Sequence, residues 1–198
     1  HMTTPTQPQA HTSIEDYLED EQGGDIKHEY LAGQVVAMGG ASDKHGFIAG
    51  SLYAALLPAA RRKHCQLFIA DMKVRVDHDT GSYFYYPDLL LTCDPDDKES
   101  PYYRRHPCLL VEVLSPSTER IDAREKLFAY RLLPSLCEYL LLRQDRLQAD
   151  LYQLNDEGRW QHKVFTHPDD ALALRSLDVA VTLHNVYADV PELLSPAG

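Results

Sequence analysis

"YYPDLLLTCDPDDKESPYYRRHPCLLVEVLSPST", residues 85–118, contains two runs of large aliphatic residues, and each run carries one carboxylate. Asp88 opens the run "PDLLL", and Glu112 lies in the middle of "LLVEVL". A carboxylate buried among apolar side chains costs several kcal/mol unless it is paired, protonated or bound to a cation. These two positions are therefore the first candidates for a functional site.

The side chains of a strand alternate between its two faces, which relates the two carboxylates to their neighbours. Asp88 and Leu90 share one face of the first strand. Leu110, Glu112 and Leu114 share one face of the second. If the two strands are adjacent, both carboxylates point into one site.

Two carboxylates at close range repel each other unless a cation lies between them. Mg²⁺ takes one or two carboxylates together with waters and phosphate oxygens, and such an ion can activate water for phosphodiester hydrolysis. The alternative is a structural role, in which each carboxylate pairs with a buried arginine or lysine. A structure with Asp88 and Glu112 on different faces would establish that alternative.

Length and composition indicate one folded domain. The chain has 198 residues, of which 44% are hydrophobic, enough to bury a core without a metal or disulfide scaffold. Residues 1–12 begin with "HM", typical of a cloning remnant, and continue as polar, proline-punctuated sequence. We expect residues 1–12 to form a disordered tail and residues 13–198 to form a single domain.

Apolar runs and cysteines bear on location. No apolar stretch approaches the roughly 20 residues needed to span a bilayer, and no basic-then-apolar leader stands at the N-terminus. Cys65, Cys93, Cys108 and Cys137 occur singly, without the C-x-x-C pairs typical of zinc or redox sites. We expect buried, reduced thiols in a cytoplasmic protein with no membrane partner.

The charge distribution works against nonspecific adhesion to nucleic acid. The net charge is -11, whereas binding to a polyanion draws on clustered cations. Residues 93–99 are rich in acids and residues 104–106 are basic. We expect each cluster to be solvated mixed surface, an interpretation that leaves a nuclease possible.

The hydrophobic pattern predicts an α/β domain. Helical spacing with capping residues predicts helices over residues 13–22, 42–64 and 118–135, and Pro58 is expected to kink or end the second of them. Other segments have strand-like or turn-like sequence, and they predict a hairpin around Gly33, strands over residues 65–79, 81–94, 107–115 and 137–143, and a C-terminal hairpin turning at "NDEG". The unit of strand, helix and strand indicates a right-handed crossover in a mixed sheet.

Several ordered motifs resemble those of the Uma-type restriction endonuclease family, a branch of the PD-(D/E)XK nuclease superfamily. They are "HEYLAGQVVAMGGASDKH", "DMKVRV", "YPDLLL", "LLVEVLSPST" and "DAREKLFAYRLLPSLCEYLLL". The resemblance covers about residues 13–143 and less securely the C-terminal hairpin. It implies a restriction-endonuclease-like mixed central sheet flanked by helices, with an additional β-hairpin, in a single nuclease-like domain over residues 13–198.

The resemblance also implies a metal site for Mg²⁺ or Mn²⁺. Its ligands would be Asp88, Glu112 and the backbone carbonyl of Val113. The superfamily pattern has a lysine two residues after the glutamate, where this chain has Leu114. That lysine orients the attacking water or steadies the developing charge, so its absence needs a substitute.

Lys126 is the candidate substitute, because the family pattern has a lysine in this helix. The alternative is an ion pair on the helix surface with Asp122, four residues earlier. Glu29 matches an acidic position that would assist at the metal, and the alternative is an exposed hairpin glutamate. His45 matches a family position near a helix N-terminus, where it could contact substrate or support a ligand, or simply cap the helix.

Two functions follow from these residues. The first is a metal-dependent endonuclease that hydrolyses DNA through a metal-activated water, with Asp88, Glu112, Lys126 and Glu29 as catalytic residues. The second is a catalytically inactive nuclease-fold protein that binds nucleic acid or a protein partner, which the lysine missing at Leu114 favours. Nucleases of this architecture often cut two strands as a homodimer, so a homodimer is also expected.

Overall fold

The computed structural model describes residues 10–117 and 121–195. For residues 121 and 122 it describes the backbone but not the side chains. The expectation of a disordered tail therefore lies outside the description for residues 1–9. Thr12 donates its backbone N–H to the carbonyl of Gly33 at 2.9 Å, and the Tyr30 hydroxyl donates to the Thr12 carbonyl at 2.7 Å. Contacts with the folded domain thus begin at Thr12, inside the segment expected to be disordered.

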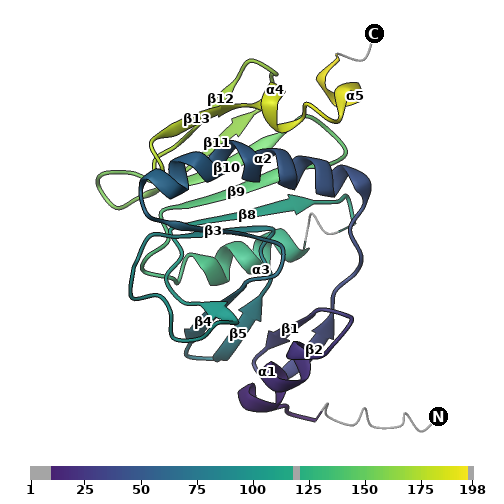
Figure 1. Ribbon diagram of the computed structural model, residues 1–198, viewed down its shortest axis with the longest axis vertical. Helices are drawn as coiled ribbons and strands as arrows, with labels where there is room; N and C mark the ends of the chain where they lie inside the picture. The colour runs from purple at the N-terminus through teal and green to yellow at the C-terminus, as the bar shows by residue number, and fades with distance from the viewer. Residues whose placement is uncertain (1–9, 118–120, 196–198) are drawn as a thin grey trace, which may run out of the picture.

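Two sheets form most of the architecture (Figure 1). The larger has six strands, in the order β11 (Trp160–Phe165), β10 (Ala149–Leu154), β9 (Glu138–Arg143), β8 (Leu109–Leu114), β6 (Leu89–Thr92) and β3 (Gln66–Ile69). The smaller has five, in the order β2 (Gln34–Ala37), β1 (His28–Leu31), β5 (Gly81–Tyr85), β4 (Lys73–His78) and β7 (Tyr103–Arg104). Both sheets are mixed. In the larger sheet β8 and β9 are parallel, in the smaller sheet β4 and β7 are parallel, and the other neighbouring strands are antiparallel. The predicted fold class is confirmed.

The remaining elements are short apart from two helices. They are α1 (Ile14–Gln22), α2 (Asp43–Arg62), α3 (Ile121–Tyr130), the pair β12 (Ala171–Leu174) and β13 (Val179–Thr182), α4 (Leu183–Val186) and α5 (Pro191–Leu194). The predicted hairpins are confirmed as β1–β2, with Gly33 at a φ of 100° in its turn, and as β10–β11. Glycine adopts this φ without the steric cost that a side chain adds.

Helix α2 covers one face of the six-stranded sheet (Figure 1). It begins at Ser42, whose side chain accepts a hydrogen bond from the amide of His45, and it continues through Pro58. Its apolar stripe includes Ile48 and Leu52, both fully buried against the sheet. The predicted helix is confirmed, and Pro58 does not end it.

Helix α3 lies on the opposite face, between the two sheets (Figure 1). Tyr130 is fully buried there, in a cluster that includes Leu110 of the larger sheet and Val74 of the smaller. The chain runs from β8 through α3 to β9, which lies beside β8 and parallel to it. This is the crossover unit that the sequence predicts.

Two of the predicted strands are each divided between the sheets. The strand expected over residues 65–79 breaks after β3, where Ala70 has a φ of 72°, and resumes as β4 in the other sheet. The strand expected over residues 81–94 breaks between Tyr85 and Leu89, where Pro87 lacks the N–H that a continuous ladder needs. Asp88 therefore lies where the chain returns to the six-stranded sheet.

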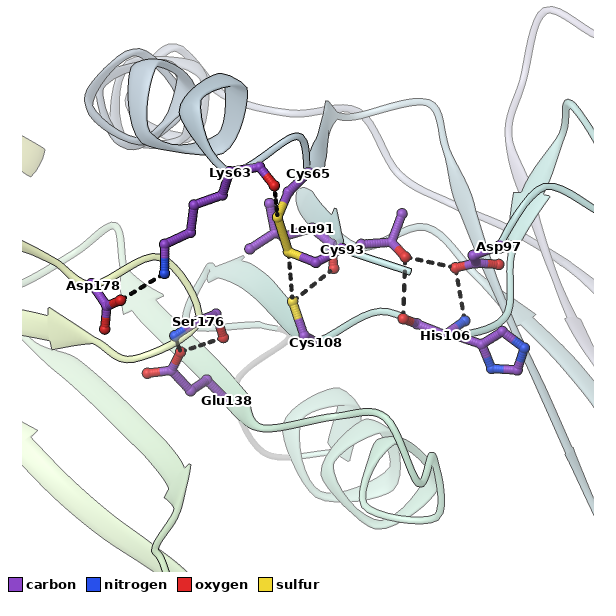
Figure 2. Close-up of a disulfide and its surroundings, with 11 residues drawn as sticks. Lys63, Cys65, Leu91, Cys93, Asp97, His106, Cys108, Glu138, Ser176 and Asp178 are labelled. Atoms are coloured by element: carbon purple, nitrogen blue, oxygen red, sulfur yellow. Dashed lines mark hydrogen bonds and ion pairs between the residues drawn. A yellow bond between two sulfur atoms is a disulfide. The ribbon is translucent and has the colours of Figure 1, made fainter. Parts of the chain in front are cut away.

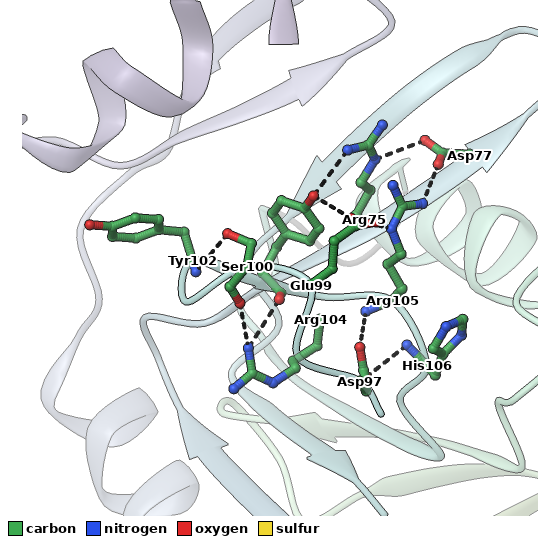
Figure 3. A network of polar contacts seen from close by, with 10 residues as sticks. Arg75, Asp77, Asp97, Glu99, Ser100, Tyr102, Arg104, Arg105 and His106 are labelled. Atoms are coloured by element: carbon green, nitrogen blue, oxygen red, sulfur yellow. Dashed lines mark hydrogen bonds and ion pairs between the residues drawn. The ribbon is translucent and has the colours of Figure 1, made fainter. Parts of the chain in front are cut away.

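The segment that joins β6 to β8 is held by its own charges (Figure 3). Arg105 donates to Asp77 and to Glu99, each at 2.6 Å. Asp97 is only 4% exposed and accepts hydrogen bonds from the amides of Arg105 and His106 at 2.8 and 2.9 Å. Glu99 is 53% exposed, as expected of a solvated mixed surface, whereas Asp97 departs from that expectation because it is buried and holds the backbone of the basic residues.

The cysteines also differ from the prediction (Figure 2). Cys65 and Cys93 form a disulfide, and the thiol of Cys108 lies 3.7 Å from the Cys93 sulfur. Cys137 is free and exposed. The expectation of buried, reduced thiols is therefore wrong, because the end of α2 and the end of β6 meet although 28 residues separate them. The disulfide also removes the support that reduced thiols gave to a cytoplasmic location.

Removing the disulfide is expected to lower the free energy of unfolding. The double variant Cys65→Ser/Cys93→Ser releases a loop closed over 28 residues, and constraints of this size contribute about 2–4 kcal/mol. Urea unfolding under oxidising conditions measures the difference. Cys137→Ser is the control and should change stability by no more than about 0.5 kcal/mol. Equal unfolding midpoints for the parent and the double variant would contradict the prediction.

No helix within residues 10–117 and 121–195 combines the length and the apolar character that crossing a membrane requires.

Candidate functional site

Asp88 and Glu112 face each other across adjacent strands. Strands β6 and β8 are antiparallel neighbours, with Leu89 opposite Val111. Continuing that register by one residue places Asp88 opposite Glu112, and the amide of Asp88 donates to the Val111 carbonyl at 2.9 Å. Directly opposite residues project to the same side of a sheet. The two carboxylates therefore lie on the same face, and the arrangement that would have established a purely structural role is not found.

Both oxygens of the Asp88 carboxylate are engaged. Oδ2 accepts a hydrogen bond from the amide of Val113 at 2.6 Å, and Oδ1 lies 2.9 Å from Nε2 of His45. The Asp88 side chain remains 18% exposed, so a ligand can still reach it. These contacts fix the orientation of the carboxylate and place the backbone of Val113 beside it.

His45 reaches Asp88 from the first turn of α2. Its amide is hydrogen-bonded to the Ser42 side chain, which caps the helix, so its backbone is also held. The hydrogen bond to Asp88 raises the pKa of His45 above its usual value, against the opposing effect of burial. His45 is thus held against the carboxylate, where sequence reasoning allowed it to be only a helix cap.

Glu112 is deeply buried at the centre of β8. It is 5% exposed and accepts a hydrogen bond from the Tyr130 hydroxyl at 3.0 Å. Burial raises its pKa to about 8, and the nearby charges of Asp88 and Glu29 act in the same direction, while Lys126 opposes them. Without a bound cation, Glu112 therefore tends to hold a proton near neutral pH.

Lys126 lies beside Glu112, although it comes from α3 rather than from β8. Its Nζ is 3.7 Å from Oε1 of Glu112 and 3.7 Å from Oε2 of Glu29. Leu114, at the position where the superfamily has its lysine, is 4% exposed and packs in the apolar cluster under α3. The alternative partner of Lys126, the side chain of Asp122, lies outside the described residues.

Glu29 approaches from the other sheet. It lies on β1, in the hairpin near the N-terminus, opposite Val36. Its side chain is 14% exposed, so it is not the exposed hairpin glutamate of the alternative interpretation. The structure thus brings all five predicted side chains into one place, with Val113 beside them.

Two tyrosines at the site were missed by sequence reasoning. Tyr130 donates to Glu112, and the ring centroid of Tyr85 lies 5.9 Å from Nζ of Lys126. A helical periodicity argument could have found Tyr130, because it follows Lys126 by four residues on the same face of α3. Tyr85 has no such signal, because its position depends on how the two sheets pack.

The donor set suits a hard divalent cation. Mg²⁺ binds one or two carboxylates and keeps several waters, and Asp88 and Glu112 supply two carboxylates next to the backbone of Val113. Within the part of the chain that the structure describes, no three or more His, Cys, Asp or Glu side chains are grouped as a metal cage. The residues therefore fit an ion that retains water better than a cation fully enclosed by protein.

Replacing Glu112 with glutamine is expected to stabilise the metal-free protein at alkaline pH. The folded protein keeps a proton on Glu112 up to a pKa of about 8, whereas the unfolded chain releases it near 4.5. The proton on Glu112 therefore adds to the free energy of unfolding at low pH. This contribution is lost as the pH rises from the pKa of the unfolded chain to that of the folded protein. In EDTA, Glu112→Gln should remove that loss, a gain on the order of a few kcal/mol above pH 8.

Urea unfolding of the parent and the variant across this pH range measures the effect. Glu157→Gln, at the exposed β10–β11 turn, is the control and should follow the parent at every pH. A constant stability difference between Glu112→Gln and the parent would contradict the raised pKa.

This combination of a mixed sheet, two facing carboxylates on its central strands and a lysine beside them defines the restriction-endonuclease-like class of fold. The chain belongs to the Uma2 family, described as "Putative restriction endonuclease", which matches residues 14–184. The resemblance predicted from the sequence is therefore confirmed.

The chain is also similar to individual proteins from Synechocystis and Anabaena. The chain is 35% identical over 184 residues to the protein slr1290 of Synechocystis sp., over 93% of this chain and 95% of that one. It is 29% identical over 147 residues to sll1609 of the same organism, over 73% and 82% of the two chains. The crystal structure of a "putative nuclease belonging to DUF820" from Anabaena variabilis has a similar fold, with a TM-score of 0.71 at 14% identity over 88% of this chain and 96% of that one.

Proposed function

We propose that this protein is a metal-dependent endonuclease that hydrolyses DNA phosphodiester bonds. The observation that carries the proposal is the meeting of Asp88 and Glu112 across β6 and β8, with Lys126 3.7 Å from Glu112. Membership of the Uma2 family supports the reaction class. The substrate and the ion are inferred from the chemistry of these side chains.

Asp88, Glu112 and the carbonyl of Val113 would hold Mg²⁺ or Mn²⁺. A bound divalent ion lowers the pKa of water and offsets the charge of a phosphate under attack. Asp88 is oriented for this task by the Val113 amide and His45. Glu112 is oriented by the Tyr130 hydroxyl, and its rigid strand fixes where its oxygens can lie.

Lys126 and Glu29 act next to these ligands. The ammonium of Lys126 can donate a hydrogen bond to a water or to a phosphate oxygen and stabilise negative charge that develops there. Glu29 lies 3.7 Å from the same ammonium and holds it at the site. Lys126 thus takes the role that a lysine at position 114 has in the superfamily pattern.

A cleavage screen tests this proposal. Single-stranded, duplex and branched DNA are incubated with the full chain and Mn²⁺, and products are compared with those of Asp88→Ala. Cleavage that needs both Mn²⁺ and Asp88 is the expected result. Absence of cleavage on every substrate would favour the second candidate, a protein of this fold that binds nucleic acid or a partner without cutting, which the replacement of lysine by Leu114 supports.

Quaternary structure and location complete the proposal. A homodimer would present one site to each strand of a duplex, so we include it in the proposal, and the molar mass measured in solution by light scattering tests it directly. A cytoplasmic location is part of the proposal only because DNA is the proposed substrate, since the Cys65–Cys93 disulfide does not support it.

A further inference from the structure

A cavity of about 510 Å³ lies between the five-stranded sheet and α3, outside the cluster of carboxylates. Its volume is within the range of roughly 300–1,000 Å³ that small-molecule sites have. Its lining includes four side chains with flat rings, namely His78, Tyr83, Tyr85 and Phe128. The proposed reaction at Asp88 and Glu112 makes no use of this cavity.

The rings of the cavity are arranged in parallel. His78 and Tyr83 stack with centroids 4.6 Å apart and an interplanar angle of 7°, and Tyr83 and Tyr85 follow at 6.1 Å and 12°. Phe128 on α3 is 71% exposed at the same cavity. Tyr83 already has a ring on each side, so a further planar ring would stack on an end of this row or on Phe128.

One ring of the cavity also lies near the proposed catalytic site. Tyr85 lines the cavity, and its ring centroid is 5.9 Å from Nζ of Lys126. The same ammonium is 3.7 Å from Glu112. A phosphate at Lys126 would therefore have its neighbouring nucleoside near Tyr85, one of the rings that line the cavity.

Charge at the cavity selects which part of a nucleotide can enter. Glu125 lines it and repels a phosphate, whereas a neutral base meets the aromatic rings. Arg124, also at the lining, supplies a positive charge for the backbone that must pass the rim. This complementarity favours a nucleotide over an acidic or purely apolar peptide.

We infer that this cavity binds the base of an unpaired nucleotide next to the scissile phosphate, an inference that rests on the proposed nuclease function. A base within a duplex is stacked and paired, so it cannot reach Phe128 and the outer rings of the row unless it leaves the helix. The preferred substrates are therefore single-stranded DNA or DNA with an extruded or unpaired base near the cut.

Binding without cleavage tests this inference. Fluorescence anisotropy in EDTA compares oligo(dT) with a duplex of equal length, using the full chain. Oligo(dT) should bind more tightly, and Tyr83→Ala and Phe128→Ala should each weaken its binding by about 5- to 150-fold. Phe128→Leu, which stays apolar but lacks a ring, should also bind oligo(dT) weakly. Phe128→Trp, which keeps a ring, should bind it as tightly as the parent does.

The control is Val164→Ala, at a side chain on β11 that is 53% exposed, which should bind as the parent does. Because Phe128 is largely exposed, its variants test the idea even if Tyr83→Ala fails to fold. Photocrosslinking of oligonucleotides that contain 5-iododeoxyuridine should label Tyr83 or Phe128.

Three results would overturn the inference. The first is that Phe128→Ala and Phe128→Leu both bind oligo(dT) as tightly as the parent does. The second is that the parent binds the duplex more tightly than oligo(dT). The third is that Phe128→Ala changes from dimer to monomer while its DNA affinity stays the same, which would make the cavity an interface between copies. Ring-dependent binding in a protein that cleaves nothing would leave the inference standing and remove the proposed nuclease. Mn²⁺-dependent cleavage that Phe128→Ala leaves unaltered, with parental binding, would remove the inference alone.

Discussion

Replacing Asp88 with asparagine is expected to lower the affinity for Mn²⁺ by at least about 100-fold, beyond the roughly 10- to 100-fold that changing an outer partner costs. Asparagine keeps an oxygen that can accept from the Val113 amide, so the fold should survive while the negative charge is lost. Calorimetric titration at a pH above 8, where Glu112 is ionised, measures the affinity. DNA cleavage should fall with it to the background of the assay.

Asp77→Asn is the matched control for this variant. Asp77 is also a carboxylate on a strand end, but it binds Arg75 and Arg105 on the smaller sheet, away from Glu112. Its removal should leave Mn²⁺ affinity unchanged. Equal Mn²⁺ affinity in Asp88→Asn and the parent would show that Asp88 is no ligand, and the proposed site would fail with it.

Replacing Lys126 with methionine is expected to reduce the rate of cleavage by about 10²–10³-fold without weakening Mn²⁺ binding. Methionine keeps the apolar stem of the side chain but cannot donate a hydrogen bond or carry charge. Because the ammonium lies 3.7 Å from Glu112, its loss removes a competing cation, so Mn²⁺ affinity should stay equal or increase. Cleavage rates at saturating Mn²⁺ and calorimetric titration separate the two effects.

Lys126→Arg should recover part of the cleavage, since it restores a positive donor at a different geometry. Lys98→Met, at an exposed loop residue, is the control for loss of a lysine elsewhere. Parental cleavage by Lys126→Met would mean that Lys126 serves only as an ion-pair partner of Glu29 and Glu112. The substitution for the missing lysine at Leu114 would then have to be sought in another residue.

The centre of the candidate site could be predicted because it depends on local pattern. Alternation within "PDLLL" and "LLVEVL" fixes which residues share a face with Asp88 and Glu112, and adjacency of the two strands then brings the carboxylates together. Helix α2 was found for the same reason, since Ser42 and the apolar stripe lie within one segment. Lys126 and Glu29 needed the family resemblance, because no spacing links them to Glu112.

The errors arise where distant segments meet. Residues 65–79 contain no glycine or proline, so nothing local shows that the chain leaves one sheet at Ala70 and enters the other. The disulfide depends on the end of α2 reaching the end of β6, and the role of Tyr85 depends on packing between sheets. These features depend on packing between segments that are far apart in the sequence. A short stretch of sequence therefore does not reveal them.

The position of Glu29 on one sheet and of Glu112 on the other makes the site sensitive to sliding between layers. Lys126 touches both carboxylates from a helix that lies between the sheets, so the three groups stay together only while both layers keep their packing on α3. A ligand that binds this junction would fasten the layers to each other and resist their shear. The assembly of the proposed site and the mechanical coupling of the two sheets therefore depend on the same packing.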